Sequence, residues 1–171
     1  MKKIIAVTGP ESTAKSTLTK ELASHFQALS FPEYAREYLA EKGHHYAYED
    51  VEEIAREQVR QYELARQSTA GMVIFDTWLI ITKVWFEWVY RRTPEWLEQA
   101  IRENPVDLYL LCKPDIPWEP DPLREHGGEE REHLFQLYKN ELISRGFSFA
   151  EIGGMGEERV LQAIEAINEI I

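Results

Sequence analysis

Five short apolar segments alternate with longer helical patterns, and this alternation constrains the fold more than any other feature of the chain. The segments that predict strands are Lys3–Thr8, Leu29–Phe31, Met72–Phe75, Val106–Cys112 and Gly146–Ile152. The segments that predict helices are Ser16–Leu29, Val51–Gln67, Trp78–Arg91, Glu95–Arg102, Glu129–Ser144 and Glu157–Ile170. Strands that alternate with helices are typical of βαβ units with parallel strands. The sequence therefore predicts a three-layer α/β/α fold with a five-stranded parallel sheet, formed by residues 1–171 as a single domain.

Charge and composition narrow the possible partners and the cellular location. The chain has 171 residues and a formal net charge of −11, which disfavours binding to the phosphate backbone of nucleic acids. Its most apolar stretch, residues 78–90, is interrupted by Lys83 and Glu87, so no segment is long enough to span a membrane. A single cysteine, Cys112, cannot form an intramolecular disulfide. We therefore expect a cytoplasmic protein with neither a nucleic-acid nor a membrane partner.

A phosphate-binding loop is predicted directly after the first strand. The pattern G-x-x-x-x-G-K-[ST] is matched, except for Ala14, by the residues Gly9, Pro10, Glu11, Ser12, Thr13, Ala14, Lys15, Ser16 and Thr17. In this pattern main-chain N–H groups at a helix N-terminus bind the ATP phosphates, the lysine adds a positive charge, and the Ser16 hydroxyl ligates Mg²⁺. An ordinary strand–loop–helix connection is the alternative, but the position between strand and helix favours ATP. We expect Ala14 to have a negative φ, because its methyl group disfavours the left-handed region.

Carboxylates follow the second and third predicted strands, at the edge where ligands bind in parallel sheets. Asp76 ends the third strand, where phosphate-loop proteins carry an acidic residue that reaches Mg²⁺ through water; capping the following helix is the alternative. Glu33 follows Pro32 and is a candidate to deprotonate an acceptor hydroxyl or to bind a ribose. Arg36 is a candidate to hold the substrate or a phosphate, unless both residues lie in a solvated loop. The sequence does not decide between Glu33 and Asp76 as the base.

The proline-rich segment at about residues 114–133 is predicted to be a lid over the ligand edge. Arg124 and Arg131 are its candidates for contact with the transferred phosphoryl group. Trp118 is a candidate to stack on a flat ring, and Asp115 and Asp121 to hydrogen-bond a sugar. The alternative is an exposed loop in which the arginines pair with neighbouring glutamates.

Other residues carry weaker predictions. The histidines do not have the spacing of a zinc site. Trp78, Ile81, Trp85 and Trp88 form a helical stripe, which indicates core packing more than a ligand site, although the first turn is also suited to wall an aromatic pocket. Cys112 is expected to be buried and unreactive. The loop of residues 153–156 is rich in glycine and is the expected neighbour of the adenine ring.

Taken together, the chain resembles the NadR-type ribosylnicotinamide kinase family, within the phosphate-loop nucleoside and nucleotide kinases. The segments that carry the resemblance are residues 9–16, 32–38, 75–77, 117–118 and 121–124. The block Glu33-Tyr34-Ala35-Arg36-Glu37-Tyr38 is the most specific of them. This chain departs from the family pattern at Ala14, at Trp78 and in the sequence Asp-Pro-Leu-Arg of the lid.

The resemblance implies a Mg²⁺-dependent kinase that transfers the γ-phosphoryl group of ATP to the 5′-hydroxyl of nicotinamide riboside. The residues expected to carry out the transfer are Lys15, Glu33, Asp76 and Arg124. The expected ATP-binding residues are those of positions 9–17 together with Arg131, and Ser16 and Asp76 are the expected metal ligands. The expected substrate-binding residues are Glu33, Tyr34, Arg36, Asp115, Trp118 and Asp121. A kinase for another nucleoside or nucleotide and a nucleotide-dependent regulatory ATPase remain as alternatives.

Overall fold

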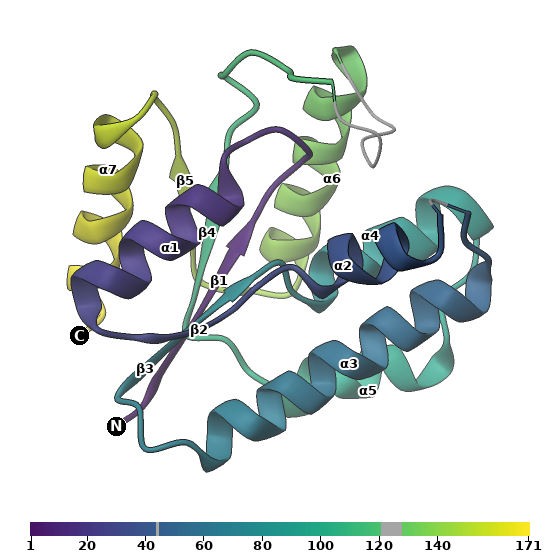
Figure 1. The fold of residues 1–171 in the computed structure, drawn as a ribbon, viewed down its shortest axis with the longest axis horizontal. Coiled ribbons are helices and arrows are strands. Elements are labelled where there is room, and N and C mark those ends of the chain that lie inside the picture. Colours follow the sequence, from purple (N-terminus) through teal and green to yellow (C-terminus); the bar gives the residue numbers. More distant parts are fainter. Residues whose placement is uncertain (44, 121–127) are drawn as a thin grey trace.

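A computed structural model describes residues 1–43, 45–120 and 128–171 of the chain. Its strands are β1 (Lys3–Thr8), β2 (Leu29–Phe31), β3 (Met72–Asp76), β4 (Leu108–Cys112) and β5 (Phe149–Ile152). They form one sheet in the order β2-β3-β1-β4-β5, and every neighbouring pair is parallel (Figure 1). The prediction of a three-layer α/β/α fold with a five-stranded parallel sheet is confirmed.

The helices agree with the sequence pattern except in two places. They are α1 (Lys15–Phe26), α2 (Tyr34–Glu41), α3 (Tyr48–Gln67), α4 (Leu79–Trp85), the π-helical turn η1 (Phe86–Tyr90), α5 (Glu95–Glu103), α6 (Glu129–Ser144) and α7 (Glu157–Asn168). Every predicted helix is present, with ends that differ by up to three residues. Helix α2 was not predicted, and the aromatic helix predicted over residues 78–91 changes from α to π geometry after Trp85.

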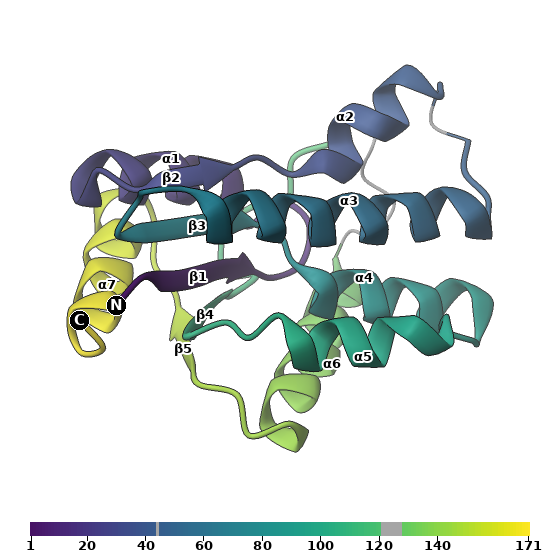
Figure 2. The same ribbon diagram turned by 90° about the horizontal axis from the view of Figure 1, so that it is seen from below.

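Two helical layers cover the two faces of the sheet, because side chains alternate along each strand. In β1, Ile5 and Val7 pack with α1 and α7, whereas Ile4 and Ala6 pack on the face covered by α3, α4, α5 and α6 (Figure 2). Both faces of the strand are therefore buried, which explains its continuous apolar run. Among the described helices, none has the length and hydropathy that crossing a membrane requires.

Tight packing at the carboxyl ends of β1 and β4 shapes the ligand edge of the sheet. Gly9 follows β1 with φ +146, and a Cβ atom there would lie 2.7 Å from the main-chain oxygen of Cys112. Only glycine fits this position, so the phosphate loop begins directly against β4. Cys112 is fully buried as predicted, and burial raises the pKa of its thiol to about 11. The neighbouring strand β3 is in register with β1, with Val7 opposite Asp76.

Candidate active site

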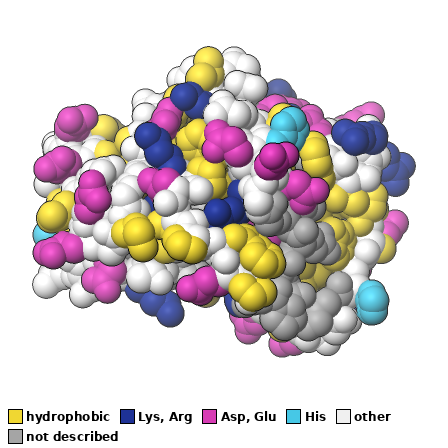
Figure 3. Space-filling model, turned by 90° about the horizontal axis from the view of Figure 1, so that it is seen from above, with side chains coloured by type: hydrophobic (Ala, Val, Ile, Leu, Met, Phe, Trp, Pro, Cys, Tyr) yellow, Lys and Arg dark blue, Asp and Glu magenta, His cyan; other side chains and the backbone are white. Residues whose placement is uncertain are grey.

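A cavity of about 570 Å³ opens at the carboxyl edge of the sheet. Figure 3 views the molecule from this edge and shows acidic and basic side chains close together on it. The cavity brings together residues predicted from three separate segments of the sequence: the phosphate loop, the connection after β2, and the end of β3. The predicted site residues that line it are Gly9, Glu11, Ser12, Thr13, Ala14, Lys15, Ser16, Thr17, Glu33, Arg36 and Asp76.

The phosphate loop leads directly into the first turn of α1, which begins at Lys15. The hydroxyl of Thr13 donates a hydrogen bond to the main-chain oxygen of Pro10 at 2.8 Å, and the Lys15 ammonium donates to the same oxygen at 2.9 Å. A helix N-terminus carries a partial positive charge and free N–H groups. The loop and Lys15 therefore form a site that is suited to a polyphosphate.

The expectation that Ala14 has a negative φ is wrong. Ala14 has φ 59 and ψ 28, and Ser12 also lies in the left-handed region with φ 55. An alanine in this conformation is strained by about 1–2 kcal/mol. The turn into α1 needs the conformation that glycine supplies at the second position of the pattern, so this chain carries strain in its phosphate loop.

Asp76 is positioned for a metal-binding role. Its Oδ2 atom accepts a hydrogen bond of 2.5 Å from the Ser16 hydroxyl. Its Oδ1 atom is buried and has no hydrogen-bond partner in the described part of the chain. The N-cap of α4 is Trp78, so Asp76 does not cap that helix. A buried oxygen without a donor, next to a hydroxyl and the phosphate loop, fits the environment of Mg²⁺.

No group of three or more His, Cys, Asp or Glu residues able to hold a metal is found among the described residues. A metal at Ser16 and Asp76 would therefore share its coordination with ligand phosphates and water, as Mg²⁺ commonly does.

Thr77, directly after Asp76, is a second strained position in the cavity wall. It has φ 73, which is an outlier for a β-branched residue, and its N–H donates to the Val7 oxygen at 3.0 Å. Its hydroxyl is buried without a hydrogen-bond partner in the described structure. Strain of this kind is concentrated at functional sites, which is consistent with the candidate site at the end of β3.

Glu33 lies at the N-terminus of α2 and faces the phosphate loop across the cavity. Burial raises the pKa of its carboxyl group; the positive charge of Lys15 opposes this effect, and the negative charge of Asp76 adds to it. Arg36, one turn further along α2, also lines the cavity and is exposed. Residues 34–41 form a helix, so Arg36 lies on a helix and not in a loop, and Glu33 is the residue directly before it.

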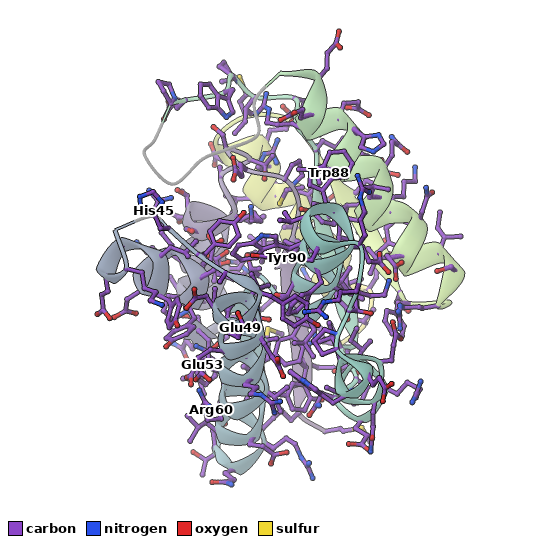
Figure 4. All side chains as sticks on the ribbon, turned by 90° about the vertical axis from the view of Figure 1, so that its right-hand side faces the viewer. His45, Glu49, Glu53, Arg60, Trp88 and Tyr90 are labelled. Carbon is purple, nitrogen blue, oxygen red and sulfur yellow. The ribbon has the colours of Figure 1, made fainter. Side chains whose placement is uncertain are left out.

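Aromatic side chains that the site prediction did not include line the cavity opposite the loop: Tyr46, Trp85, Trp88 and Tyr138. Trp85 and Trp88 follow Ile81 at helical spacing, so the stripe noted in the sequence forms this wall, while Trp78 is a fully buried core residue. Figure 4 shows Trp88 on the side of η1 that faces α6, where its ring centroid lies 5.0 Å from that of His133. Tyr138 carries no local sequence signal, because only the fold brings it here.

Several predicted residues lie away from the cavity. Tyr34 is not among the described lining residues, and its ring contacts that of Tyr38 with a centroid distance of 5.7 Å. Asp115 and Trp118 are also absent from the described lining. Asp115 instead pairs with Arg159 and accepts a hydrogen bond of 2.8 Å from the Gly154 N–H. Asp121 and Arg124 lie outside the described residues.

Arg131 is buried and contacts the main chain. It donates to the oxygens of Ser12 at 3.0 Å and Ile116 at 2.9 Å. Its predicted contact with ATP remains a prediction, as does the lid. Within the described part of that segment, the Glu119 N–H donates to the Ser12 hydroxyl at 3.0 Å, so residues near 119 lie against the phosphate loop.

The loop, the strand-end carboxylate and the parallel sheet together define a nucleotide-binding protein of the phosphate-loop class. The chain belongs to the AAA domain family, whose model matches residues 4–159. It is also similar to the "Trifunctional NAD biosynthesis/regulator protein NadR" of Escherichia coli (strain K12), with 27% identity over 98% of this chain. The same description and identity apply to the relative from Salmonella typhimurium (strain LT2). The chain spans 42% of the length of these two relatives.

Solved structures agree with this assignment. A NadR protein in complex with NAD and AMP-PNP is 25% identical, with a TM-score of 0.79 over 99% of this chain and 49% of that chain. A NadR protein in complex with NR has a TM-score of 0.81 at 23% identity, covering 99% of this chain and 50% of that one. A deoxyadenosine kinase from M. mycoides has a TM-score of 0.70 at 15% identity, covering 99% and 100%. The fold is that of phosphate-loop nucleoside kinases, and the resemblance to NadR-type proteins is confirmed.

Proposed function

We propose that this protein is an ATP- and Mg²⁺-dependent nucleoside kinase whose preferred acceptor is nicotinamide riboside. One observation carries the proposal: a single cavity of about 570 Å³ runs from the phosphate loop to an end lined by Glu33, Arg36 and aromatic rings. That volume lies within the usual range for small-ligand sites. An ATPase switch needs only the nucleotide end of such a cavity, whereas a kinase also needs the acceptor end.

At the nucleotide end, the loop binds the phosphates of ATP and Lys15 neutralises charge on the transferred group. Lys15 leaves the Pro10 oxygen, to which it donates at 2.9 Å, when phosphate oxygens become available. Ser16 and Asp76 would hold Mg²⁺, which supplies charge neutralisation to the phosphates when it is bound. The unpartnered Oδ1 atom of Asp76, buried in the described structure, supports this role.

At the acceptor end, Glu33 is the proposed general base. The nucleoside hydroxyl attacks the γ-phosphorus, a new O–P bond forms, the bond to the ADP oxygen breaks, and the hydroxyl proton passes to the Glu33 carboxylate. Asp76 is the weaker candidate because one of its oxygens already accepts the Ser16 hydroxyl. The raised pKa of Glu33 supports its role, since a base gains driving force for proton transfer as its pKa approaches the working pH.

The aromatic wall favours a flat cationic ring. The rings of Tyr46, Trp85 and Trp88 line the acceptor end, and Glu33 contributes negative charge there. Aromatic faces attract cations, most strongly where water is excluded. The nicotinamide ring of the riboside is a pyridinium cation, so this wall suits it better than it suits a neutral purine or pyrimidine.

A nucleotide is a weaker acceptor candidate because it brings a second phosphate, which needs its own cation. Lys83 is not available for this purpose: it is buried and donates to Glu87 at 2.6 Å and to Glu141 at 2.8 Å. Of the described basic residues, Lys15, Lys20 and Arg36 line the cavity, and the two lysines lie on α1, which follows the phosphate loop. Arg36, on α2, is the one described cation outside that helix in the lining, and a single arginine there suits the riboside better than the phosphorylated compound.

The test is a steady-state assay with ATP, MgCl₂ and a panel of nucleosides and nucleotides, with products identified by mass spectrometry. We expect nicotinamide mononucleotide from nicotinamide riboside, with a higher kcat/KM than for any neutral nucleoside. If ATP turnover does not depend on any acceptor and no phosphorylated product forms, the proposed kinase function is refuted. Efficient phosphorylation of a different nucleoside would support the kinase function and refute the preference for nicotinamide riboside.

A further inference from the structure

Two buried arginines hold the outer side of the phosphate loop, and we propose that they are positioning residues for nucleotide binding. Arg131, on α6, donates to the main-chain oxygen of Ser12 at 3.0 Å. Arg159, on α7, donates to the main-chain oxygen of Thr13 at 3.2 Å. The two residues are 7% and 2% exposed, so both are largely removed from solvent. Helices more than 100 residues away in the sequence thus contact two consecutive carbonyl groups of the loop.

Peptide geometry links these contacts to the phosphate site. No cis peptide bond occurs in the described backbone, and in a trans peptide the C=O and N–H groups point in opposite directions. The peptide that carries the Ser12 oxygen also carries the Thr13 N–H. The next peptide carries the Thr13 oxygen and the Ala14 N–H. Fixing the two oxygens from outside therefore fixes the direction of two N–H groups on the inner side, where Thr13 and Ala14 line the cavity.

The loop needs such support because Ala14 stands where glycine is usual. Ser12, which carries the first held carbonyl, and Ala14, which follows the second, have φ values of 55 and 59. Without its restraints, an alanine relaxes toward negative φ, which turns its N–H away from the phosphate site. The arginines oppose this relaxation, so they take over part of the role of the missing glycine.

Further contacts fix Arg159 in one position. It also donates to the Gly154 oxygen at 2.9 Å and to the Lys113 oxygen at 3.2 Å, and it pairs with the Asp115 carboxylate. The guanidinium fork can make these contacts together, whereas a lysine offers a point charge. The role of Asp115 follows from this pair: it balances the buried charge of Arg159 and does not reach the cavity.

The experiment measures the Kd for ADP, with MgCl₂ present, by calorimetry in Arg159→Gln and Arg131→Gln, each with and without Ala14→Gly. Thermal unfolding of each variant establishes that it is folded. We expect each arginine change to weaken ADP binding about 10-fold or more, comparable to the loss of a buried charged hydrogen bond. In the Ala14→Gly background the same change should weaken binding by less than about 3-fold, because glycine holds the left-handed conformation without help.

Arg145→Gln is the matched control. Arg145 is also partly buried and donates to Glu98 and Glu141, each at 2.9 Å, but it is not among the described residues of the cavity. It should change the unfolding temperature and leave the Kd unchanged. If Arg159→Gln does not fold, Arg159→Lys replaces it, with an intermediate loss that Ala14→Gly again reduces.

Equal losses of ADP affinity in the two backgrounds, or no loss from either arginine change, would overturn the proposal. The inference rests on nucleotide binding at this loop, which the proposed kinase also needs, but the two fail separately. If ADP binding depends on Arg159 and Ala14 but the protein phosphorylates no acceptor, the proposed kinase function is refuted and the positioning role stands. If the protein phosphorylates its acceptor normally and neither the Arg131 nor the Arg159 change alters the Kd for ADP, the positioning role is refuted and the kinase function stands.

Discussion

The proposed nucleotide end of the cavity is built mainly from one continuous stretch of chain, residues 9–17, with Asp76 added from the end of β3. The proposed acceptor end is built from the α2 N-terminus, Tyr46, α4, η1 and α6. At the first end, main-chain N–H groups are the proposed donors to the ligand, and side chains from α6 and α7 hold the loop from outside. At the second end, side chains line the cavity directly. The first end is thus sensitive to backbone conformation, and the second to the identity and packing of single side chains.

This difference predicts how the two ends respond to mutation. Changes at the nucleotide end should affect every reaction of the protein, because every acceptor needs the same ATP. Changes at the acceptor end should alter the kcat or the KM for the acceptor, or the ranking of acceptors, and leave ADP binding intact.

The largest effect is expected from Lys15→Ala. The variant loses the charge that neutralises the transferred phosphoryl group, so kcat should fall about 10³-fold or more for every acceptor. Within the described part of the chain, the Lys15 ammonium donates to the Pro10 oxygen alone, so the unfolding temperature should change little. Lys139→Ala removes the same charge from a pair with Glu151 and should leave kcat unchanged. Phosphoryl transfer that survives in Lys15→Ala would contradict the assignment of the phosphate loop.

Glu33→Gln should have the next largest effect, lowering kcat about 10²-fold or more, as is typical for loss of a general base. Because burial raises the pKa of Glu33, the wild-type rate should rise with pH through a range above that of an ordinary glutamate. The variant should lose this dependence. Glu37→Gln, on the exposed side of the same helix, is the control. If the rate of Glu33→Gln still rises with pH as it does in the wild type, a group other than Glu33 is the base.

The stability of the same variant gives an independent check with a defined sign. A carboxyl group whose pKa is raised by folding favours the folded state when it is protonated, and this contribution is lost as the pH rises through the folded-state pKa. The glutamine variant should therefore gain stability relative to the wild type as the pH rises through that window. Thermal unfolding of both proteins across a pH series measures it, and a difference that is independent of pH would contradict the raised pKa.

Trp88→Ala should have a smaller effect, confined to the acceptor. Loss of one aromatic wall should raise the KM for a cationic nucleoside about 10-fold, in line with the strength of cation–π contacts, and leave the Kd for ADP unchanged. Trp96→Ala is the matched control, because Trp96 donates to Glu52 and lies outside the described cavity lining. Equal losses for cationic and neutral nucleosides would show that the ring contributes packing only.

The same difference explains which parts of the molecule the sequence predicted. The sheet followed from apolar runs and helical spacing, and the phosphate loop from residues adjacent in the chain, because both signals are local. Asp76 followed from the rule that ligands bind at the carboxyl ends of parallel strands. Tyr138 was missed because only tertiary packing brings it to the cavity.

One predicted role and one helix were not obtained from the sequence, for physical reasons of the same kind. Asp115 was expected at a sugar, but the burial of Arg159 requires a nearby carboxylate, and Asp115 pairs with it. Helix α2 was not predicted because its apolar face is short: Ala35 and Leu39 pack on Ile54 of α3. Neither the partner of a buried charge nor a small satellite of the core is visible in the local sequence. α3 was easier to predict, since charged residues such as Glu49, Glu53 and Arg60 mark its outer face (Figure 4).

The smallest predicted effect is on the stability of the fold, at Ala14, where an alanine has a backbone conformation that favours glycine. Ala14→Gly removes the strain of an alanine at φ 59 but gives the unfolded chain more freedom, so the net gain should be about 0.5–1 kcal/mol. Ala40→Gly, on the exposed side of α2, should instead lose about 0.5–1 kcal/mol, because glycine is unfavourable inside a helix. Denaturant unfolding of both variants measures whether the free energy of unfolding rises or falls relative to the wild type. A loss of stability in Ala14→Gly would mean that the left-handed conformation is not the one that this loop adopts, and the argument for the two arginines would then fail at its first step.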